Sequence, residues 1–232
     1  MQISFQNQVR LMKKIIQTGV IISIICFFGC SSKPTNEQSN TYSNNHPTFQ
    51  EQLDTFTKLG FISNPATDSS DIRRWVGHEE YEKQPYSLMY TMLGRTMEGE
   101  SNTPLTNKCW DFDTEAIEGH GSYVRIIENL ERIARGELKF EEVKDYVAIE
   151  EGRAWVSFKL NSDYYKWNLK VEDDWVDTDL FPKIVELTAK YNTKGRYTYF
   201  DTGGQNAVFG YEISDELEKI KTATRLKIEW LN

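Results

Sequence analysis

The stretch AWVSFKLNSDYYKWNLKV, residues 154–171, decides the fold class. Apolar residues take every second position on both sides of the polar segment Asn161-Ser162-Asp163. Alternation with a period of two is typical of half-buried strands, and a short polar segment between two such runs predicts a β-hairpin. We therefore expect a first hairpin at about residues 154–171.

A second hairpin is predicted at about residues 196–213, around the turn Gly203-Gly204-Gln205-Asn206. Apolar residues at helical spacing predict helices between and around these hairpins. Their expected starts are Thr48, which opens a capping-box pattern, Ser122, Thr178 or Asp179, and Ser214. This order of elements predicts an α+β fold, with an antiparallel-rich sheet built from two hairpins and helices packed on one face.

The composition is that of a folded chain. The 232 residues are 39% hydrophobic and 13% aromatic, which excludes a disordered protein. There are 27 Lys and Arg against 35 Asp and Glu, a formal net charge of -8. Because phosphate neutralisation by Lys and Arg dominates nucleic-acid affinity, this acidity argues against a nucleic-acid partner.

The N-terminal region carries the clearest functional signal. Lys13 and Lys14 precede an apolar run, residues 15–28, and Gly29-Cys30 follows it. A basic segment, a short apolar segment and a small residue before the cut are typical of a secretory signal peptide. We therefore predict a signal peptide at residues 1–29, with Met12 as an alternative start.

The segment Phe27-Phe28-Gly29-Cys30 resembles the lipobox of bacterial lipoproteins, with Phe27 in place of the usual Leu. The resemblance implies that Cys30 is diacylated on sulfur, with palmitate-type chains, and that the peptide is cut before it. It also implies a cell-envelope protein anchored in the lipid bilayer through Cys30. Because Ser31, and not Asp, follows the cysteine, the resemblance implies the outer membrane in a cell that has one.

Residues 30–47 are rich in Ser, Asn and Thr and predict a flexible tether after the lipidated cysteine. Residues 48–232 are expected to form a single globular α+β domain. Residues 1–29 contain three bases and no acid, so the cleaved chain has 24 bases against 35 acids and a formal charge of -11. The acyl chains must then hold an acidic domain at the bilayer, for which one chain is marginal and two or three are sufficient.

The sequence contains none of the common hydrolase, phosphate-binding or metalloprotease motifs. Cys109 with His120 is the best nucleophile candidate, and some envelope lipoproteins are wall hydrolases that resemble papain. In that family, however, the histidine lies far downstream of the cysteine, and no histidine follows His120. We therefore predict a non-catalytic domain with no catalytic residues, cofactor or metal, and keep a papain-like envelope hydrolase as an alternative.

Two acidic runs are the other candidate sites. Asp111, Asp113 and Glu115 alternate, so on a strand they would share one face, either as a solvated face or as ligands of a hard cation. The denser run includes Asp173, Asp174 and Asp177, just before a predicted helix. We predict that these three residues form an acidic surface for a basic protein partner.

A third possibility is a carbohydrate-binding surface, because flat aromatic rings stack on sugars. Trp155, Tyr164 and Trp175 are the rings that the pattern directs outward. A surface carbohydrate-binding lipoprotein is therefore a further alternative.

The acidic surface, the absence of catalytic motifs and the two-hairpin α+β layer resemble the immunity proteins of bacterial polymorphic toxins. The resemblance implies an acidic face that blocks a basic toxin domain, and it carries no individual site residues over. Our first functional prediction is thus a membrane-anchored envelope lipoprotein with a non-catalytic, protein-binding domain of immunity type.

Overall fold

The computed structural model describes residues 46–62, 69–74, 76–97 and 103–232. The predicted signal peptide, Cys30 and nearly all of the tether lie outside the described residues. Within the described ranges, no helix combines the length and the apolar character that crossing a membrane requires.

The predicted α+β class is confirmed. The helices are α2 (Phe49–Lys58), α3 (Ser69–Ile72), α4 (His78–Lys83), α5 (Ser87–Leu93), α6 (Ser122–Ile133), α7 (Leu180–Lys190) and α8 (Ser214–Thr224), with a 3-10 turn at Ile149–Glu151. The strands are β1 (Thr96–Met97), β2 (Thr103–Pro104), β3 (Cys109–Asp113), β4 (Phe140–Ala148), β5 (Arg153–Leu160), β6 (Asp163–Leu169), β7 (Arg196–Asp201), β8 (Asn206–Glu212) and β9 (Glu229–Trp230). All the strand pairings among these elements are antiparallel.

Both predicted hairpins form, β5–β6 and β7–β8, but they belong to different sheets. The first hairpin joins a three-stranded sheet of order β4-β5-β6, and the second joins a four-stranded sheet of order β3-β8-β7-β9. The register places Phe158 opposite Tyr165 in the first hairpin. In the second, Tyr199 lies opposite Phe209.

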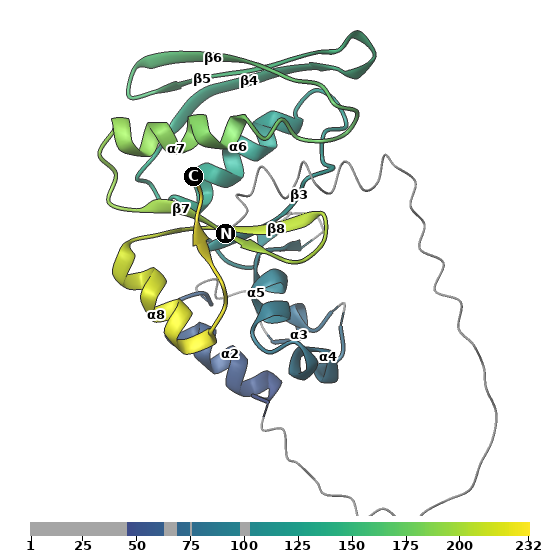
Figure 1. Ribbon diagram of the computed structural model, residues 1–232, viewed down its shortest axis with the longest axis vertical. Coiled ribbons are helices and arrows are strands. Elements are labelled where there is room, and N and C mark those ends of the chain that lie inside the picture. The colour runs from purple at the N-terminus through teal and green to yellow at the C-terminus, as the bar shows by residue number, and fades with distance from the viewer. Residues whose placement is uncertain (1–45, 63–68, 75, 98–102) are drawn as a thin grey trace, which may run out of the picture.

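The elements stack in layers (Figure 1). Helices α6 and α7 lie between the two sheets, and α2, α5 and α8 lie on the far side of the four-stranded sheet. The alternation of that sheet explains the arrangement. In β8, Phe209 packs into the cluster with α6, α7 and the three-stranded sheet, whereas Val208 packs with α2, α5 and α8. The three-stranded sheet is thus covered by helices on one face, and the four-stranded sheet on both.

The first helix begins as the sequence predicts. Thr48 Oγ1 accepts a hydrogen bond from the Glu51 N–H at 3.3 Å, and Glu51 Oε2 accepts one from the Thr48 N–H at 2.8 Å. This reciprocal capping box satisfies two of the N–H groups that a helix N-terminus leaves free.

Helix α6 begins at Ser122 as predicted, but a residue of the neighbouring sheet caps it. The Asp145 carboxylate, on β4, accepts hydrogen bonds from the N–H groups of Gly121, Tyr123 and Val124 at 2.7–3.2 Å. The Ser122 hydroxyl instead accepts from the Glu118 N–H at 3.1 Å. A negative charge also complements the helix dipole there, so Asp145 joins α6 to the three-stranded sheet.

A buried carboxyl group lies at the end of β8. Glu212 Oε2 lies 3.6 Å from Lys108 Nζ and 3.7 Å from the Arg135 guanidinium, and this one oxygen of the carboxyl group makes no hydrogen bond among the described residues. The pKa of Glu212 is raised to about 8, first because the group is buried and second because it hydrogen-bonds to Glu216. Near neutral pH, therefore, Glu212 holds a proton.

This proton makes stability depend on pH. The folded state binds it up to about pH 8, whereas the unfolded chain releases it above the ordinary value of 4.5. The free energy of unfolding should therefore fall between about pH 5 and 8, by roughly a few kcal/mol, and level off above that range. Glu212→Gln should remove this fall, and Glu218→Gln on exposed α8 should keep it. Urea unfolding from pH 5 to 9 measures both, and an unchanged slope in Glu212→Gln would contradict the assignment.

Candidate interaction surface

The fold brings the two acidic runs of the sequence together. The Ile117 N–H donates to the carbonyl oxygen of Asp174 at 2.9 Å, and the Val176 N–H donates to the carbonyl oxygen of Thr114 at 2.9 Å. The segment after β3 therefore lies beside the segment before α7. We call the resulting group the acidic surface; its members are Asp113, Glu115, Asp173 and Asp174.

The carboxylates of the acidic surface are close enough to affect one another. The pKa of Glu115 is raised by burial first, and then by the negative charges of Asp174 and Asp113. The Gln205 side-chain amide donates to Asp113 Oδ1 at 3.2 Å and to Glu115 Oε2 at 3.1 Å, but it is neutral. Like charges at such a site repel, and a cationic partner would relieve this repulsion.

Asp177, which we predicted as the third member of the partner surface, lies inside the protein. It is 7% exposed and accepts hydrogen bonds from the N–H groups of Lys170 at 2.8 Å and Asp179 at 3.1 Å. Its carboxylate therefore holds the turn into α7, because a buried charge must be satisfied by donors. Asp173 is exposed and Asp174 is half-buried, so these two carry the surface.

Asp111 is also set apart from the acidic surface. Its Oδ2 lies 3.2 Å from Arg95 Nε, and its Oδ1 accepts from the Asn206 side-chain amide at 3.4 Å. Burial raises the pKa of Asp111, and the charge of Arg95 opposes that effect. No group of three His, Cys, Asp or Glu side chains is placed to hold a metal in the part of the chain that the structure describes.

Cys109 and His120 are not brought together. Cys109 is 0% exposed, its Sγ lies 3.8 Å from the Tyr90 carbonyl oxygen, and burial raises its pKa far above the ordinary value. His120 is exposed at the edge of the three-stranded sheet, where Nδ1 accepts from the Val147 N–H at 3.0 Å and the ring packs on Tyr146. A buried, protonated thiol without a nearby base is not an activated nucleophile.

The three aromatic residues that we expected to face outward differ in their surroundings. Tyr164 is 63% exposed, but Trp175 is 8% exposed and belongs to the core, so its outward orientation was wrongly predicted. Trp155 is half-buried, with Lys166 Nζ 4.1 Å from its ring centroid and the Tyr146 ring stacked at 6.3 Å. Because these neighbours already lie against Trp155, the rings do not form an open platform for a sugar.

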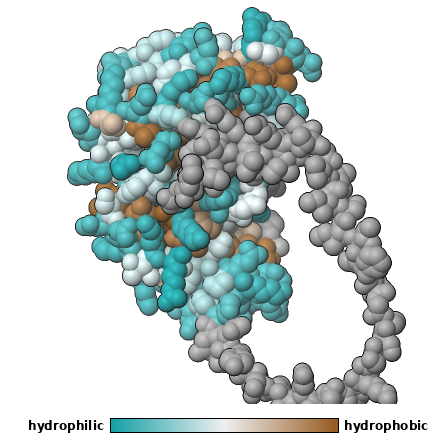
Figure 2. Space-filling model, viewed as in Figure 1, coloured by the Kyte–Doolittle hydropathy of each residue, from teal (hydrophilic) through white to brown (hydrophobic). Residues whose placement is uncertain are grey.

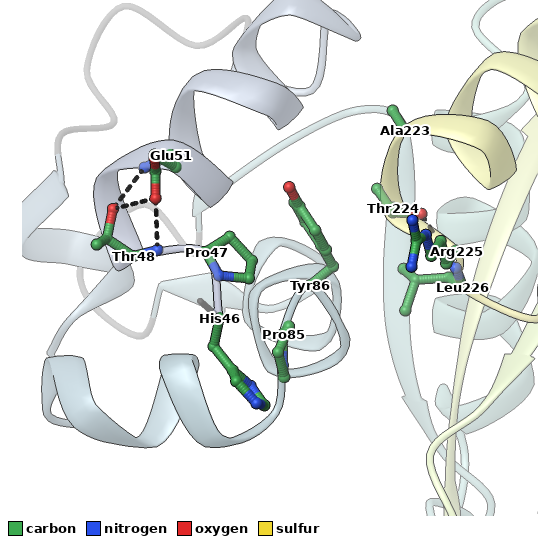
Figure 3. A pocket seen from close by; sticks show the side chains of 10 residues that line it. All are labelled: His46, Pro47, Thr48, Glu51, Pro85, Tyr86, Ala223, Thr224, Arg225 and Leu226. Carbon is green, nitrogen blue, oxygen red and sulfur yellow. Dashed lines mark hydrogen bonds between the residues drawn. The ribbon is translucent and has the colours of Figure 1, made fainter. Parts of the chain in front are cut away.

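A cavity of about 940 Å³ lies between the start of α2 and the end of α8, and Figure 3 shows the side chains that line it. His46, Thr48 and Tyr86 line one side, and the segment 223–226 lines the other. His46 Nδ1 lies 3.1 Å from the Glu82 carbonyl oxygen, and Thr48 and Glu51 are paired in the capping box. The polar groups of this cavity are therefore largely engaged in local structure.

A second cavity, of about 510 Å³, borders the acidic surface and was not anticipated from the sequence. It lies between β3 and α6, and Trp110, Phe112, Asp113 and Ile126 are among the residues that line it. Its walls come from segments whose contact depends on the tertiary fold, so no local pattern could predict it. It gives the acidic surface an apolar neighbour.

Comparison of the chain with family models, curated proteins and solved structures found no significant match.

Proposed function

We propose that this protein is a lipid-anchored lipoprotein of the bacterial envelope whose α+β domain binds a basic protein partner, in the manner of a toxin-immunity protein. The anchor is Cys30, and the binding face is the acidic surface. The anchor follows from the signal-peptide pattern, and the destination, the outer membrane where one exists, follows from Ser31.

The observation that carries the proposal is the meeting of the two acidic runs. The hydrogen bond between Ile117 and Asp174 holds together carboxylates that lie far apart in the sequence. Burial first, and then the charges of Asp174 and Asp113, raise the pKa of Glu115, so these carboxylates repel one another and a cationic face would lower that repulsion. On the face of the molecule seen in Figure 2, hydrophobic residues occur in patches between hydrophilic ones.

Reversing the charge of the acidic surface should weaken partner binding. In Asp173→Lys/Asp174→Lys, we expect the association rate constant to fall about tenfold at low salt and its salt dependence to flatten, because exposed charges act mainly by steering. The full-length protein would first capture its partner from an envelope extract. The purified partner would then be used in stopped-flow association at two salt concentrations.

The matched control is Asp54→Lys/Glu218→Lys, which makes the same change in net charge with two exposed residues of α2 and α8. It should bind with nearly the wild-type rate constant. Thermal melts should place the control within about 0.5 kcal/mol of the wild type. Asp173→Lys/Asp174→Lys should lose up to about 1 kcal/mol, because Asp173 has a φ of 56° and Lys adopts this left-handed conformation less readily than Asp. Equal association rate constants for the wild type and Asp173→Lys/Asp174→Lys would remove the acidic surface from the function.

A further inference from the structure

Strand β3 is an edge strand, and part of its outer edge faces the second cavity. In the order β3-β8-β7-β9 it pairs with β8 on one side. On the other side the Asp111 N–H donates to the Gly94 carbonyl oxygen at 2.8 Å. Because N–H groups of an antiparallel strand alternate between its two sides, the N–H of Asp113 also points away from β8.

Among the described residues, two groups reach this edge: Gly94 at Asp111, and the Arg132 guanidinium, which donates to the Cys109 carbonyl oxygen at 3.5 Å. A Cβ atom on Gly94 would lie 2.5 Å from the Asp111 nitrogen, so the contact requires glycine. After Gly94 the chain turns into the small sheet of β1 and β2, whose pairing places Thr96 opposite Pro104. The edge of β3 beyond Asp111 therefore borders the cavity that Thr96, Pro104 and Asp113 help to line.

The cavity has the size and lining of a groove for an extended chain. Its volume of about 510 Å³ lies in the range of ligand sites, and Trp110, Phe112 and Ile126 give it an apolar wall. The charged groups of α6 in its lining are Arg125, Glu128 and Arg132. Arg132 already donates to Asn129 Oδ1 at 3.0 Å and to the Thr106 carbonyl oxygen, so it is engaged in the fold.

We infer that the free part of the β3 edge binds an extended segment of the basic partner, which adds to the four-stranded sheet as a further strand. This inference rests on the proposed function and specifies the form in which the partner is recognised. Strand addition uses main-chain hydrogen bonds for affinity and alternate side chains for specificity. Both are available here, from the outward-pointing main chain at Asp113 and from the two faces of β3.

The two faces of β3 differ, and this difference defines the occupant. Trp110 and Phe112 point to one face, toward α6 and α7, whereas Asp113 points to the other. The Gln205 side-chain amide donates to both Asp113 and Glu115, so these two carboxylates lie together. Successive side chains of an added strand would meet these two faces in turn. The segment should therefore alternate apolar residues, which cover Trp110 and Phe112, with Lys or Arg, which meet the acidic surface.

A designed peptide tests this inference with the full-length protein. The probe is acetyl-KVKVKVK-amide with a fluorescent label, and its binding is measured by anisotropy in low salt. Two further probes carry N-methyl groups, one on every valine nitrogen and one on every internal lysine nitrogen. Because alternate N–H groups of a strand point to opposite edges, each modification blocks one edge only.

The expected result is an asymmetry between the two methylated probes. One should bind at least tenfold more weakly than the parent peptide, and the other should bind within about threefold. A peptide of the same composition with its lysines and valines in two separate runs, acetyl-KKKKVVV-amide, should also bind more weakly. In the presence of the parent peptide, the Asp113 amide should exchange its hydrogen more slowly, as measured by NMR.

The failures of the two proposals look different. Strand addition at β3 is wrong if acetyl-KKKKVVV-amide and both methylated probes bind like the parent peptide, or if the parent peptide shows no binding below about 1 mM. The stopped-flow test of the acidic surface does not depend on this result. If the asymmetry appears but Asp173→Lys/Asp174→Lys binds the parent as tightly as the wild type, the edge is a binding site and the acidic surface is not. Loss of binding in Asp173→Lys/Asp174→Lys, with retention in Asp54→Lys/Glu218→Lys, supports both.

Discussion

Replacement of Cys30 by serine should abolish incorporation of a palmitate analogue into this protein. The thiolate of Cys30 is the acceptor that the resemblance to the lipoprotein lipobox implies, and a serine hydroxyl does not replace it. Without its acyl chains the acidic chain has nothing to hold it to anionic headgroups, because two or three chains are needed for a stable anchor. The variant should therefore be released from the membrane or remain uncut at the inner membrane.

Metabolic labelling followed by in-gel fluorescence measures this outcome. Cys109→Ser and Cys26→Ser are the matched controls, since the first changes a buried core residue and the second a residue of the predicted signal peptide. Both should keep the label. Label that persists in Cys30→Ser would refute lipidation at this residue, and wild-type protein found only in inner-membrane fractions would refute the destination that Ser31 implies.

The largest loss of stability is expected for Phe209→Ala. Phe209 is fully buried in β8, and its ring centroid lies 5.0 Å from that of Phe181, 5.5 Å from Phe112 and 6.0 Å from Trp110. Truncation would leave a cavity at the junction of β8, β3 and α7, and such changes cost about 3–5 kcal/mol. Because whole domains have only about 5–15 kcal/mol of stability, much of the total would be lost.

Urea unfolding followed by tryptophan fluorescence measures the effect of Phe209→Ala. Tyr164→Ala is the control, because that ring is 63% exposed, and it should change the free energy of unfolding by no more than about 0.5 kcal/mol. A loss below about 1 kcal/mol in Phe209→Ala would mean that the aromatic cluster does not organise this layer.

The two hairpins could be predicted because the alternation of apolar and polar residues that forms each strand lies within a short stretch of sequence. Residues 154–160 alternate apolar and polar side chains, and the structure turns the apolar set, Val156 and Phe158 among them, into the core. The assignment of the hairpins to two sheets was not predictable in the same way. It depends on β3 pairing with β8, and on β7 pairing with β9, which are contacts between distant segments.

Strand β4 was missed for a physical reason that its sequence shows afterwards. FEEVKDYVA at residues 140–148 has charged residues at four of its nine positions, and a bulge between Glu141 and Lys144 breaks the alternation. Glu142 has a φ of 53°, in the left-handed region, which fits an irregular strand. One of these charged residues, Asp145, caps the N-terminus of α6 by accepting hydrogen bonds from the N–H groups of Gly121 and Tyr123. A residue that made the strand hard to recognise in the sequence therefore has a structural role.

Part of the candidate site could be predicted from the sequence. Each acidic run could be recognised by composition, but their contact requires the hydrogen bond between Ile117 and Asp174, and the burial of Asp177 requires the turn into α7. The cavity beside β3 was not visible, because its wall joins a strand and a helix. Composition thus predicted the charge of the site, and the fold determined which residues carry it.

The order of strands in the four-stranded sheet also has a consequence for the timing of folding. Cys109–Asp113 pairs with Asn206–Glu212, so β3 has no partner strand until the ribosome has made the segment that contains β8. Contacts between distant segments close slowly, because the loop between them must first lose conformational freedom. During synthesis the four-stranded sheet therefore cannot form until β8 has been made, which leaves time for an export apparatus to engage the predicted N-terminal signal before the domain is complete.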